Sequence, residues 1–272
     1  MNRVVRPEIW GVLNVTPDSF SDGGRFDGLD AALAHADQLI AEGADVIDVG
    51  GESTRPGAAR VSEEEELSRV LPVVTELVSQ GLRVSVDTMR ASTAAAVLEA
   101  GVHIINDVSG GLADAGMLGV ISQSTCDYVL MHWRGHSDQM DSLAVYGDVV
   151  KEVSGELKAR LDEAERNGVG RERIIVDPGL GFAKKPSHNW AVLARLDDLA
   201  PTGTRVIVGA SRKRFLGELL PTPHQPEDRD GVSAALGVLL AEHNVFALRV
   251  HNVKAQRQAL DVWQAFSEGG RS

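Results

Sequence analysis

The chain has 272 residues, of which 43% are hydrophobic and 24% are charged, a composition typical of a folded globular protein. Its formal net charge of -12 disfavours nonspecific binding to nucleic acid or to an anionic membrane surface, so neither is expected as a partner. The single cysteine, Cys126, excludes an intramolecular disulfide. We find no apolar run of the kind found in a signal peptide or a membrane span and expect a cytoplasmic protein.

Short apolar runs rich in β-branched residues alternate with helical patterns along the chain. The runs cover residues 9–15, 44–50, 82–88, 102–108, 127–133, 173–179, 204–210 and 246–252. They are almost continuously apolar, which is typical of parallel strands covered on both faces. Apolar residues at helical spacing follow them, at 29–42, 62–80, 91–100, 114–123, 143–166, 189–199, 230–242 and 254–267.

Eight strands alternating with eight helices predict an α/β fold, a (β/α)8 TIM barrel formed as a single domain by residues 1–272. An open doubly wound sheet is the alternative, but no GxGxxG fingerprint of a dinucleotide site follows the first strand. Ser62 and Glu65 have the spacing of a capping box and predict a helix start. Segments 16–28 and 220–230, rich in turn-forming residues, predict loops.

Polar residues gather where the predicted strands end. These positions hold Asn14, Asp48, Asp87, Asn106, Asp107, His132, Asp177, Ser211, Arg212, Lys213, Arg249 and His251. In a barrel of this class the C-terminal ends of all strands meet at one face, where active sites lie. Each residue has a plainer interpretation, such as a helix cap at Asp87 or a turn at Asp177, and these stay open. Their joint placement favours one site.

The carboxylates and amides among these residues indicate a heterocyclic ligand. Asp87, Asn106 and Asp177 suit a flat ring with adjacent N–H donors, because a carboxylate can accept two such bonds side by side. Lys213 would face an acceptor on the same ring. The pattern therefore predicts a site for a nitrogen heterocycle.

The remaining strand ends indicate an anionic group on that ligand. Arg249 and His251 follow the eighth strand, where barrels commonly bind phosphate. Asn14 offers an oxygen to Mg²⁺, which often bridges protein oxygens and substrate phosphates. Together the two sets of residues predict an enzyme that acts on a phosphorylated or pyrophosphorylated heterocycle.

Seven motifs carry a resemblance to a known family. They are GVLNVTPDSFSDGG (11–24), DVGGESTRPGA (48–58), VDT (86–88), NDVSGG (106–111), DPGLGFAK (177–184), GASRKRFLG (209–217) and RVHNV (249–253). In this order they resemble the dihydropteroate synthase family over roughly residues 9–265. The resemblance implies a homodimeric (β/α)8 barrel that joins 6-hydroxymethyl-7,8-dihydropterin pyrophosphate to p-aminobenzoate. It implies the products 7,8-dihydropteroate and pyrophosphate, formed with Mg²⁺.

The resemblance also implies roles for individual residues. For the pterin ring these are Asp87, Asn106, Met131, Asp177, Gly209 and Lys213. For p-aminobenzoate they are Phe20, Thr54, Arg55, Pro56, Phe182 and Ser211. For pyrophosphate they are Asn14, Arg249 and His251, with Asn14 also a Mg²⁺ ligand. As catalytic residues it implies Asp22, Lys213, Arg249 and His251, with Asp22 on a loop that helps to close the site.

One position departs from the family pattern. We expect RVHDV in the last motif, and residue 252 is asparagine. Asn252 keeps the size of an aspartate and loses its charge. If the acid orients His251 in this family, that orientation becomes less certain here.

Two alternatives remain at this level. A pterin-binding barrel that serves methyl transfer would share Asp87, Asn106 and Asp177, but would not need the STRPG turn or the SRKRFLG segment. A paralogue that kept the fold and lost the site would be a binding protein. Loss of the site would have removed Asn14, Arg55, Lys213 or His251, and the sequence retains all four.

Overall fold

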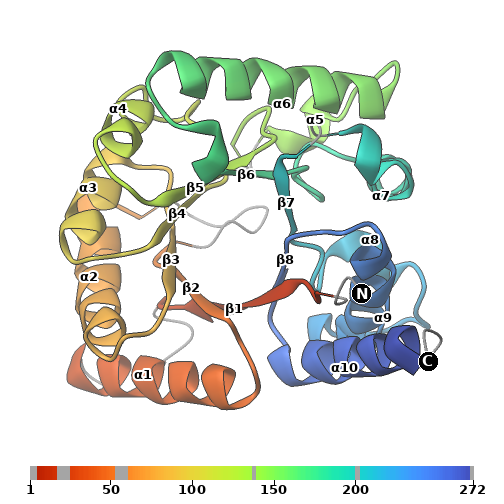
Figure 1. Ribbon diagram of the computed structural model, residues 1–272, viewed down its shortest axis with the longest axis horizontal. Coiled ribbons are helices and arrows are strands. Elements are labelled where there is room, and N and C mark those ends of the chain that lie inside the picture. The colour runs from red at the N-terminus through yellow and green to blue at the C-terminus, as the bar shows by residue number, and fades with distance from the viewer. Residues whose placement is uncertain (1–4, 17–24, 53–60, 137–138, 200–202, 270–272) are drawn as a thin grey trace.

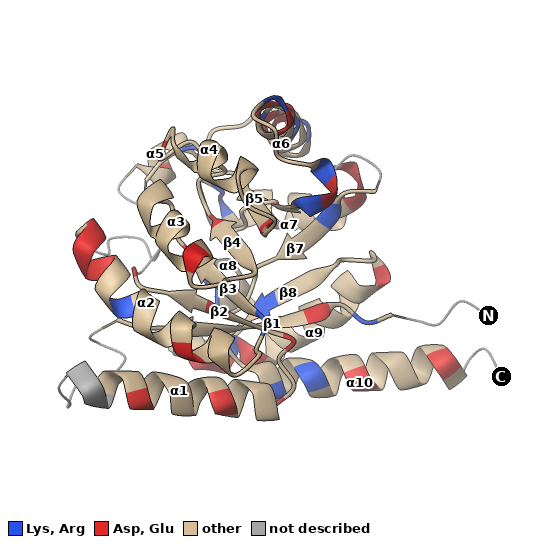
Figure 2. Ribbon diagram, turned by 60° about the vertical axis from the view of Figure 1, so that its left-hand side comes forward, with Lys and Arg blue, Asp and Glu red and all other residues tan. Residues whose placement is uncertain are grey.

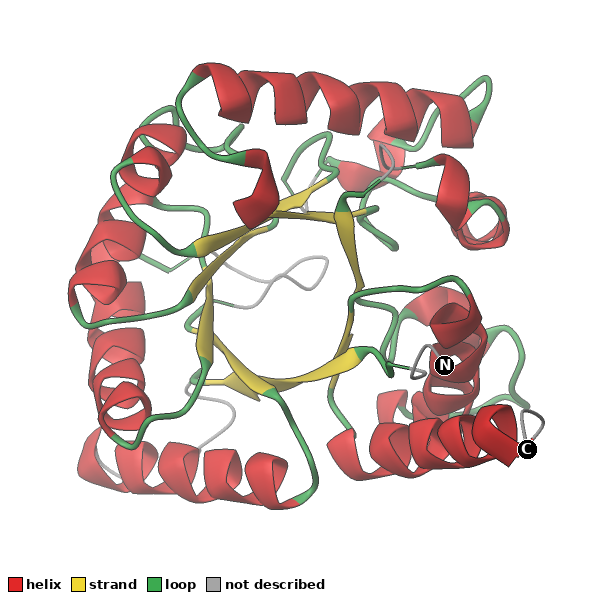
Figure 3. Cartoon of the chain, in the orientation of Figure 1, coloured by secondary structure: helices red, strands yellow, loops and turns green. Residues whose placement is uncertain are grey.

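The computed structural model describes residues 5–16, 25–52, 61–136, 139–199 and 203–269. Within these residues eight parallel strands close into a barrel in sequence order, with the helices outside it (Figures 1 and 3). The strands are β1 (Glu8–Asn14), β2 (Val46–Gly50), β3 (Val84–Asp87), β4 (Ile104–Asp107), β5 (Asp127–Met131), β6 (Ile174–Asp177), β7 (Arg205–Val208) and β8 (Ala247–Val250). The predicted (β/α)8 barrel is confirmed.

Helices connect consecutive strands and cover the barrel. They are α1 (Arg25–Ala41), α2 (Glu63–Ser79), α3 (Ala91–Glu99), α4 (Met117–Ser122), α5 (Met140–Leu143), α6 (Val149–Arg166), α7 (Pro186–Ala194), α8 (Arg214–Gly217), α9 (Asp230–Glu242) and α10 (Val253–Gly269). Each predicted helical pattern overlaps one of them. The short helices α5 and α8 were not predicted, because a single turn leaves no periodic stripe in the sequence.

Helix starts are decided by local capping. α6 begins at Val149, later than predicted, because the Asp148 carboxylate accepts a backbone N–H of its first turn at 3.2 Å. α2 begins after Ser62, whose Oγ accepts from the backbone N of Glu65 at 3.2 Å. The Ser62 half of the expected capping box is thus present, and the Glu65 carboxylate pairs with Arg69.

Alternation along the strands divides the barrel interior into two layers. The deeper, apolar layer consists of Trp10, Val46, Ile104, Val129, Ile175, Ile207 and Ala247. Side chains two positions further along a strand point the same way. The next layer therefore consists of Val12, Asp48, Asn106, Met131, Asp177, Gly209 and Arg249, joined by Asp87, which is in register with Asn106. This polar layer lies at the C-terminal ends of the strands and is called the mouth layer below.

A larger apolar core fills the space between the strands and the helices. Fully buried leucines on three helices, Leu39, Leu77 and Leu161, belong to it. Acidic and basic residues lie on the outer helices, for example on α2 and α10 (Figure 2). Among the described residues, no helix is both long and apolar enough to cross a membrane. The mouth layer therefore rests on a rigid, packed scaffold.

Candidate active site at the mouth of the barrel

A buried arginine joins two carboxylates in the mouth layer. Arg249 Nε donates to Asp48 Oδ2 at 2.5 Å, and Arg249 Nη2 donates to Asp87 Oδ2 at 2.9 Å. Asp48 is fully buried, and Asn106 Nδ2 lies 3.4 Å from each of its oxygens. The planar guanidinium suits this bridge, because its donors form a rigid fork. Asp48 and Asp87 together fix the orientation of Arg249.

The cluster carries more negative than positive charge. Burial raises the pKa of Asp87 to about 7, with Arg249 lowering it and Asp48 raising it. Burial alone would lower the pKa of Arg249, but Asp48 and Asp87 outweigh this and raise it. Since two carboxylates share one guanidinium, the ligand-free cluster takes up a proton near neutral pH.

We expect this proton to appear in the pH dependence of stability. The folded-state pKa of Asp87, about 7, lies above its unfolded value, so the stabilisation from protonation is full at low pH and is lost as pH rises through 7. From pH 6 to 8 this loss is about 1 kcal/mol in the free energy of unfolding. Asp87→Asn cannot take up the proton. Urea unfolding should show wild-type stability falling by that amount relative to the variant, and parallel pH curves would contradict the assignment.

Asp177 serves the turn after β6 and also faces the mouth. Its Oδ1 accepts from the backbone N of Gly179 at 2.7 Å, as the turn interpretation predicts. Its Oδ2 lies 3.7 Å from the place that a Cβ on Gly209 would occupy. Burial raises the pKa of Asp177, against the lowering effect of Lys213. A glycine at 209 therefore leaves the approach to this oxygen free of a side chain.

Lys213 reaches from the end of β7 to the loop between β6 and α7. Its Nζ donates to the backbone O of Leu180 and lies 4.8 Å from the centre of the Phe182 ring, within range of a cation–π contact. Burial lowers the pKa of Lys213 to about 8, while Asp177 raises it. Lys213 and Phe182 thus present a cation and an aromatic ring side by side.

Ser211 and His251 contact each other at the ends of β7 and β8. The backbone N of His251 donates to Ser211 Oγ at 3.1 Å, and the ring Nδ1 lies 3.1 Å from the same oxygen. Asn252 Nδ2 donates to Asp230 Oδ2 at 3.0 Å, and Asn252 Oδ1 accepts from the backbone N of Ala255 at 2.9 Å. An amide fits here because it donates to Asp230, which a carboxylate could not do. Asn252 thus contacts Asp230 and Ala255, and the His251 ring contacts Ser211.

Asp107 and Arg212 point away from the mouth layer. Asp107 follows Asn106 directly, so its side chain leaves the opposite face of β4. It accepts from the backbone N of Ser109 at 2.8 Å and from the hydroxyl of Tyr128 at 2.8 Å. Arg212 turns away to donate to a carboxylate on α9 at 2.7 Å. Both stabilise loops around the barrel.

Asn14 and Met131 complete the described part of the mouth. Asn14 Oδ1 lies 3.8 Å from the place that a Cβ on Gly50 would occupy, and buried Met131 is in register with Asp177. In the described part of the chain no three His, Cys, Asp or Glu residues form a group that could hold a metal ion. Asn14 offers one amide oxygen, so a Mg²⁺ ion held there would need substrate oxygens among its other ligands.

Some predicted site residues lie outside the described residues: Phe20, Asp22, Thr54, Arg55 and Pro56. Their roles stay predictions. The described residues on either side of segment 53–60 are joined by one side chain. Arg90 Nη1 donates to Glu52 Oε2 at 2.8 Å, and Arg90 Nη2 donates to the backbone O of Val61 at 2.6 Å.

The sequence analysis assigned no role to Asp48, although the strand pattern indicates that this carboxylate has a partner. A carboxylate inside an apolar run needs a partner when buried. Asp48 stands two positions after Val46, so it shares the inward face with it. Read together with an arginine on the last strand, that spacing would have predicted the pair with Arg249.

The chain is similar to proteins of a known family over nearly all of its length. The model of the pterin binding enzyme family matches residues 10–251. A dihydropteroate synthase of Mycobacterium leprae is 47% identical over 97% of this chain and 94% of that protein. A Xanthomonas albilineans dihydropteroate synthase solved with 4-aminobenzoic acid superimposes with a TM-score of 0.89 at 44% identity, covering 97% of this chain and 94% of that one. A structure from the same organism in complex with 7,8-dihydropteroate has a TM-score of 0.86 at 41% identity, covering 98% and 95%.

These matches span the chain almost completely, and they include the strand ends that form the mouth layer. The relatives named above are dihydropteroate synthases and therefore favour this family over the methyl-transferring barrel. The dihydropteroate synthases are transferases, so the chain is an enzyme of that class. The chain therefore belongs to the pterin binding enzymes and, among them, to the dihydropteroate synthase family.

Proposed function

We propose that the chain acts in the cytoplasm and condenses 6-hydroxymethyl-7,8-dihydropterin pyrophosphate with p-aminobenzoate. The products are 7,8-dihydropteroate, an intermediate of folate biosynthesis, and pyrophosphate. The observation that carries this proposal is the mouth layer, in which carboxylates, an amide and the Arg249 guanidinium come together from different strands, with Lys213 beside them. Related proteins of known structure bind 4-aminobenzoic acid and 7,8-dihydropteroate at high similarity to this chain.

In this proposal the carboxylate side of the mouth binds the pterin. Asp177 Oδ2 accepts hydrogen bonds from the edge of the ring, and the Asn106 amide donates to it. Gly209, which has no side chain, leaves room for the ring beside Asp177. Asp87 lies in register with Asn106 and is held by Arg249, so it adds a second acceptor. Met131, buried beside Asp177, packs on the ring face.

The cation side binds p-aminobenzoate. Lys213 and Ser211 offer donors to its carboxylate, and the Phe182 ring packs on its aromatic ring. A sulfonamide imitates this substrate in shape and charge, so the same wall would accept one. Both substrates then lie against Lys213, which stands between them.

The reaction proceeds by dissociation in this account. The C–O bond to pyrophosphate breaks first, and its electron pair leaves with the pyrophosphate. Arg249 and His251 stabilise that charge, while the electron-rich dihydropterin carries the positive charge on carbon. The arylamine lone pair then forms the C–N bond, and the nitrogen gives up one N–H proton to water. With Asn14 and phosphate oxygens as ligands, bound Mg²⁺ would neutralise the charge on the leaving group.

Turnover of the purified protein tests this function. We expect dihydropteroate and pyrophosphate to form in equal amounts, and chelation of Mg²⁺ to abolish both. Tight binding of the pterin pyrophosphate with neither product would mean that the site has kept its pocket and lost its chemistry. It would refute the proposed reaction while leaving the family assignment intact.

We also propose that the protein is a homodimer that pairs through α9 and α10. These helices lie side by side (Figure 1) and carry large exposed apolar side chains, with Leu239 63%, Val262 70% and Phe266 84% exposed. Val262 and Phe266 stand one turn apart on α10, so they share a stripe.

Phe266→Glu should convert this dimer to a monomer, since a carboxylate buried in an apolar interface loses its hydration and gains no partner. Light scattering coupled to size exclusion measures the mass of each protein. The exposed Glu268→Gln on the same helix is the control and should stay dimeric. A wild-type protein that is monomeric at micromolar concentration would contradict the proposal.

A further inference from the structure

Lys184 is buried beside the mouth, although lysine is among the residues least often buried. Its Nζ lies 2.8 Å from His132 Nδ1, 3.0 Å from the backbone O of Gly179 and 3.3 Å from the backbone O of Phe182. Burial lowers the pKa of Lys184 to about 7, while Asp177 raises it. In its ammonium form the group has three donors and no acceptor. All three donors are therefore used, and two of them hold carbonyls of one loop.

His132 connects this lysine to helix α6. Since its Nδ1 accepts from Lys184, its Nε2 carries the proton and donates to Glu156 Oε2 at 2.9 Å. Burial and the charge of Lys184 lower the pKa of His132 to about 4, which keeps the ring neutral at pH 7, as this arrangement needs. His132 is 2% exposed and therefore has little freedom to rotate.

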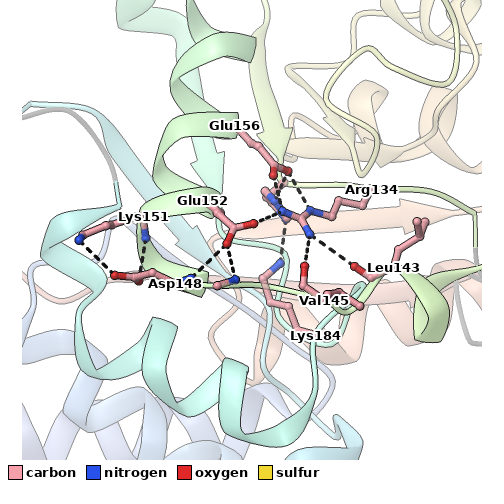
Figure 4. A network of polar contacts seen from close by, with 10 residues as sticks. Arg134, Leu143, Val145, Asp148, Lys151, Glu152, Glu156 and Lys184 are labelled. Carbon is pink, nitrogen blue, oxygen red and sulfur yellow. Dashed lines mark hydrogen bonds and ion pairs between the residues drawn. The ribbon is translucent and has the colours of Figure 1, made fainter.

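Glu156 is fixed in turn by Arg134, as Figure 4 shows. Arg134 Nε and Nη2 donate to the two Glu156 oxygens at 3.1 and 2.5 Å, and Nη2 also donates to Glu152 Oε2 at 2.9 Å. Arg134 Nη1 donates to the backbone O of Val145 at 2.8 Å. A continuous hydrogen-bonded chain thus runs from the outer helix α6 to Lys184 (Figure 4).

The loop held by Lys184 contains backbone positions with positive φ, including one at a residue that is not glycine. Gly179, Gly181 and Ala183 have φ of 65°, 75° and 46°. A positive φ is costly for a residue with a Cβ, so the loop around Ala183 must be held by its surroundings. On its mouth side the same loop presents Leu180 and Phe182 to Lys213.

We propose that Lys184 is a positioning residue for p-aminobenzoate, acting through the backbone of the loop that carries Phe182. Lys184 holds the loop from behind, and His132 and Glu156 hold Lys184. The substrate meets Phe182 and Lys213 on the opposite side of that loop. This inference rests on the proposed function, because the substrate that the loop receives belongs to it.

Adjacent lysines allow a matched test. Lys184→Met keeps the length and removes the three donors, while Lys185→Met makes the same change at an exposed residue. We expect Lys184→Met to raise the KM for p-aminobenzoate by about tenfold to a hundredfold, the scale of a small misplacement of a binding group. The Kd of the pterin pyrophosphate should change by much less than this, because Lys184 makes no direct hydrogen bond to Asp177 or Asn106 and is connected to Asp177 only through the backbone of Gly179. Lys185→Met should leave both unchanged.

The outer end of the chain gives a second test that does not touch the interior. Glu156→Ala removes the acceptor for His132 and should raise the KM for p-aminobenzoate by less than Lys184→Met does. Glu156→Gln keeps an acceptor, so its KM for p-aminobenzoate should stay close to that of the wild type. In the double variant with Lys184→Met, the Glu156→Ala change should add nothing, because both act through one chain.

The outcomes separate this inference from the function on which it rests. A wild-type protein that makes no dihydropteroate refutes the proposed function. An active wild type with equal KM values for Lys184→Met and Lys185→Met refutes the positioning role alone. Equal losses in pterin and p-aminobenzoate binding would also refute it. If Lys184→Met does not fold, the two Glu156 variants test the inference instead. Equal KM values for Glu156→Ala and Glu156→Gln would then overturn it.

Discussion

Replacing Arg249 by lysine is expected to lower kcat/KM by roughly a thousandfold, or about 4 kcal/mol of transition-state stabilisation. The guanidinium donates through Nε to Asp48 and through Nη2 to Asp87. Its remaining donors can still face a leaving group. A lysine keeps the charge but has a single nitrogen, so it cannot hold both carboxylates and also face pyrophosphate.

Steady-state kinetics with both substrates measures this loss, and most of it should fall on kcat because charge develops as pyrophosphate leaves. Arg257→Lys on α10 is the control, since Arg257 makes only an ion pair with Asp261 one turn away. Urea unfolding of each variant separates loss of function from loss of fold. A decrease of less than tenfold for Arg249→Lys would remove it from the catalytic group.

Replacing Gly179 by alanine is expected to reduce the free energy of unfolding by about 2 to 4 kcal/mol and to remove most activity. Gly179 has a φ of 65°, and a Cβ there would stand 2.2 Å from the backbone O of His132. A carbonyl in a barrel strand end cannot move aside, so the loop must shift. That shift would carry Phe182 away from Lys213 and break the bonds to Lys184.

Gly81→Ala separates the clash from the cost of the backbone conformation. Gly81 has a φ of 76°, similar to that of Gly179, but a Cβ there would meet nothing within 4 Å. Its loss should be about 1 kcal/mol, the ordinary cost of a side chain at positive φ. Urea unfolding and turnover of the two variants test the difference. Equal destabilisation would show that the contact with His132 is not tight.

The barrel could be predicted from the sequence because its strongest signals are local. Continuous apolar runs give the strands, and helical spacing gives the elements between them. The same spacing cannot give the start of α6, because the Asp148 cap depends on a side-chain bond rather than on periodicity. Short helices such as α5 and α8 lie below the length that periodicity can detect.

The candidate site could be predicted in part for the same reason. Asp87, Asn106 and Asp177 end strands, so their common face follows from topology. The link between Asp48 and Arg249 joins residues 201 positions apart, and only the closed barrel brings them together. The chain from Lys184 through His132 to Glu156 has no sequence pattern, since each partner comes from a different element.

The most direct test of the mechanism is a secondary isotope effect in single-turnover experiments. The dihydropterin pyrophosphate would carry two deuterium atoms on the methylene carbon that is transferred. Single turnover is needed because it observes the chemical step rather than product release. Dissociation flattens this carbon before the arylamine arrives, so the account predicts that the deuterated substrate reacts clearly more slowly. Equal rates for the two substrates would mean that p-aminobenzoate displaces pyrophosphate directly, and the mouth layer would not be stabilising a separated ion pair.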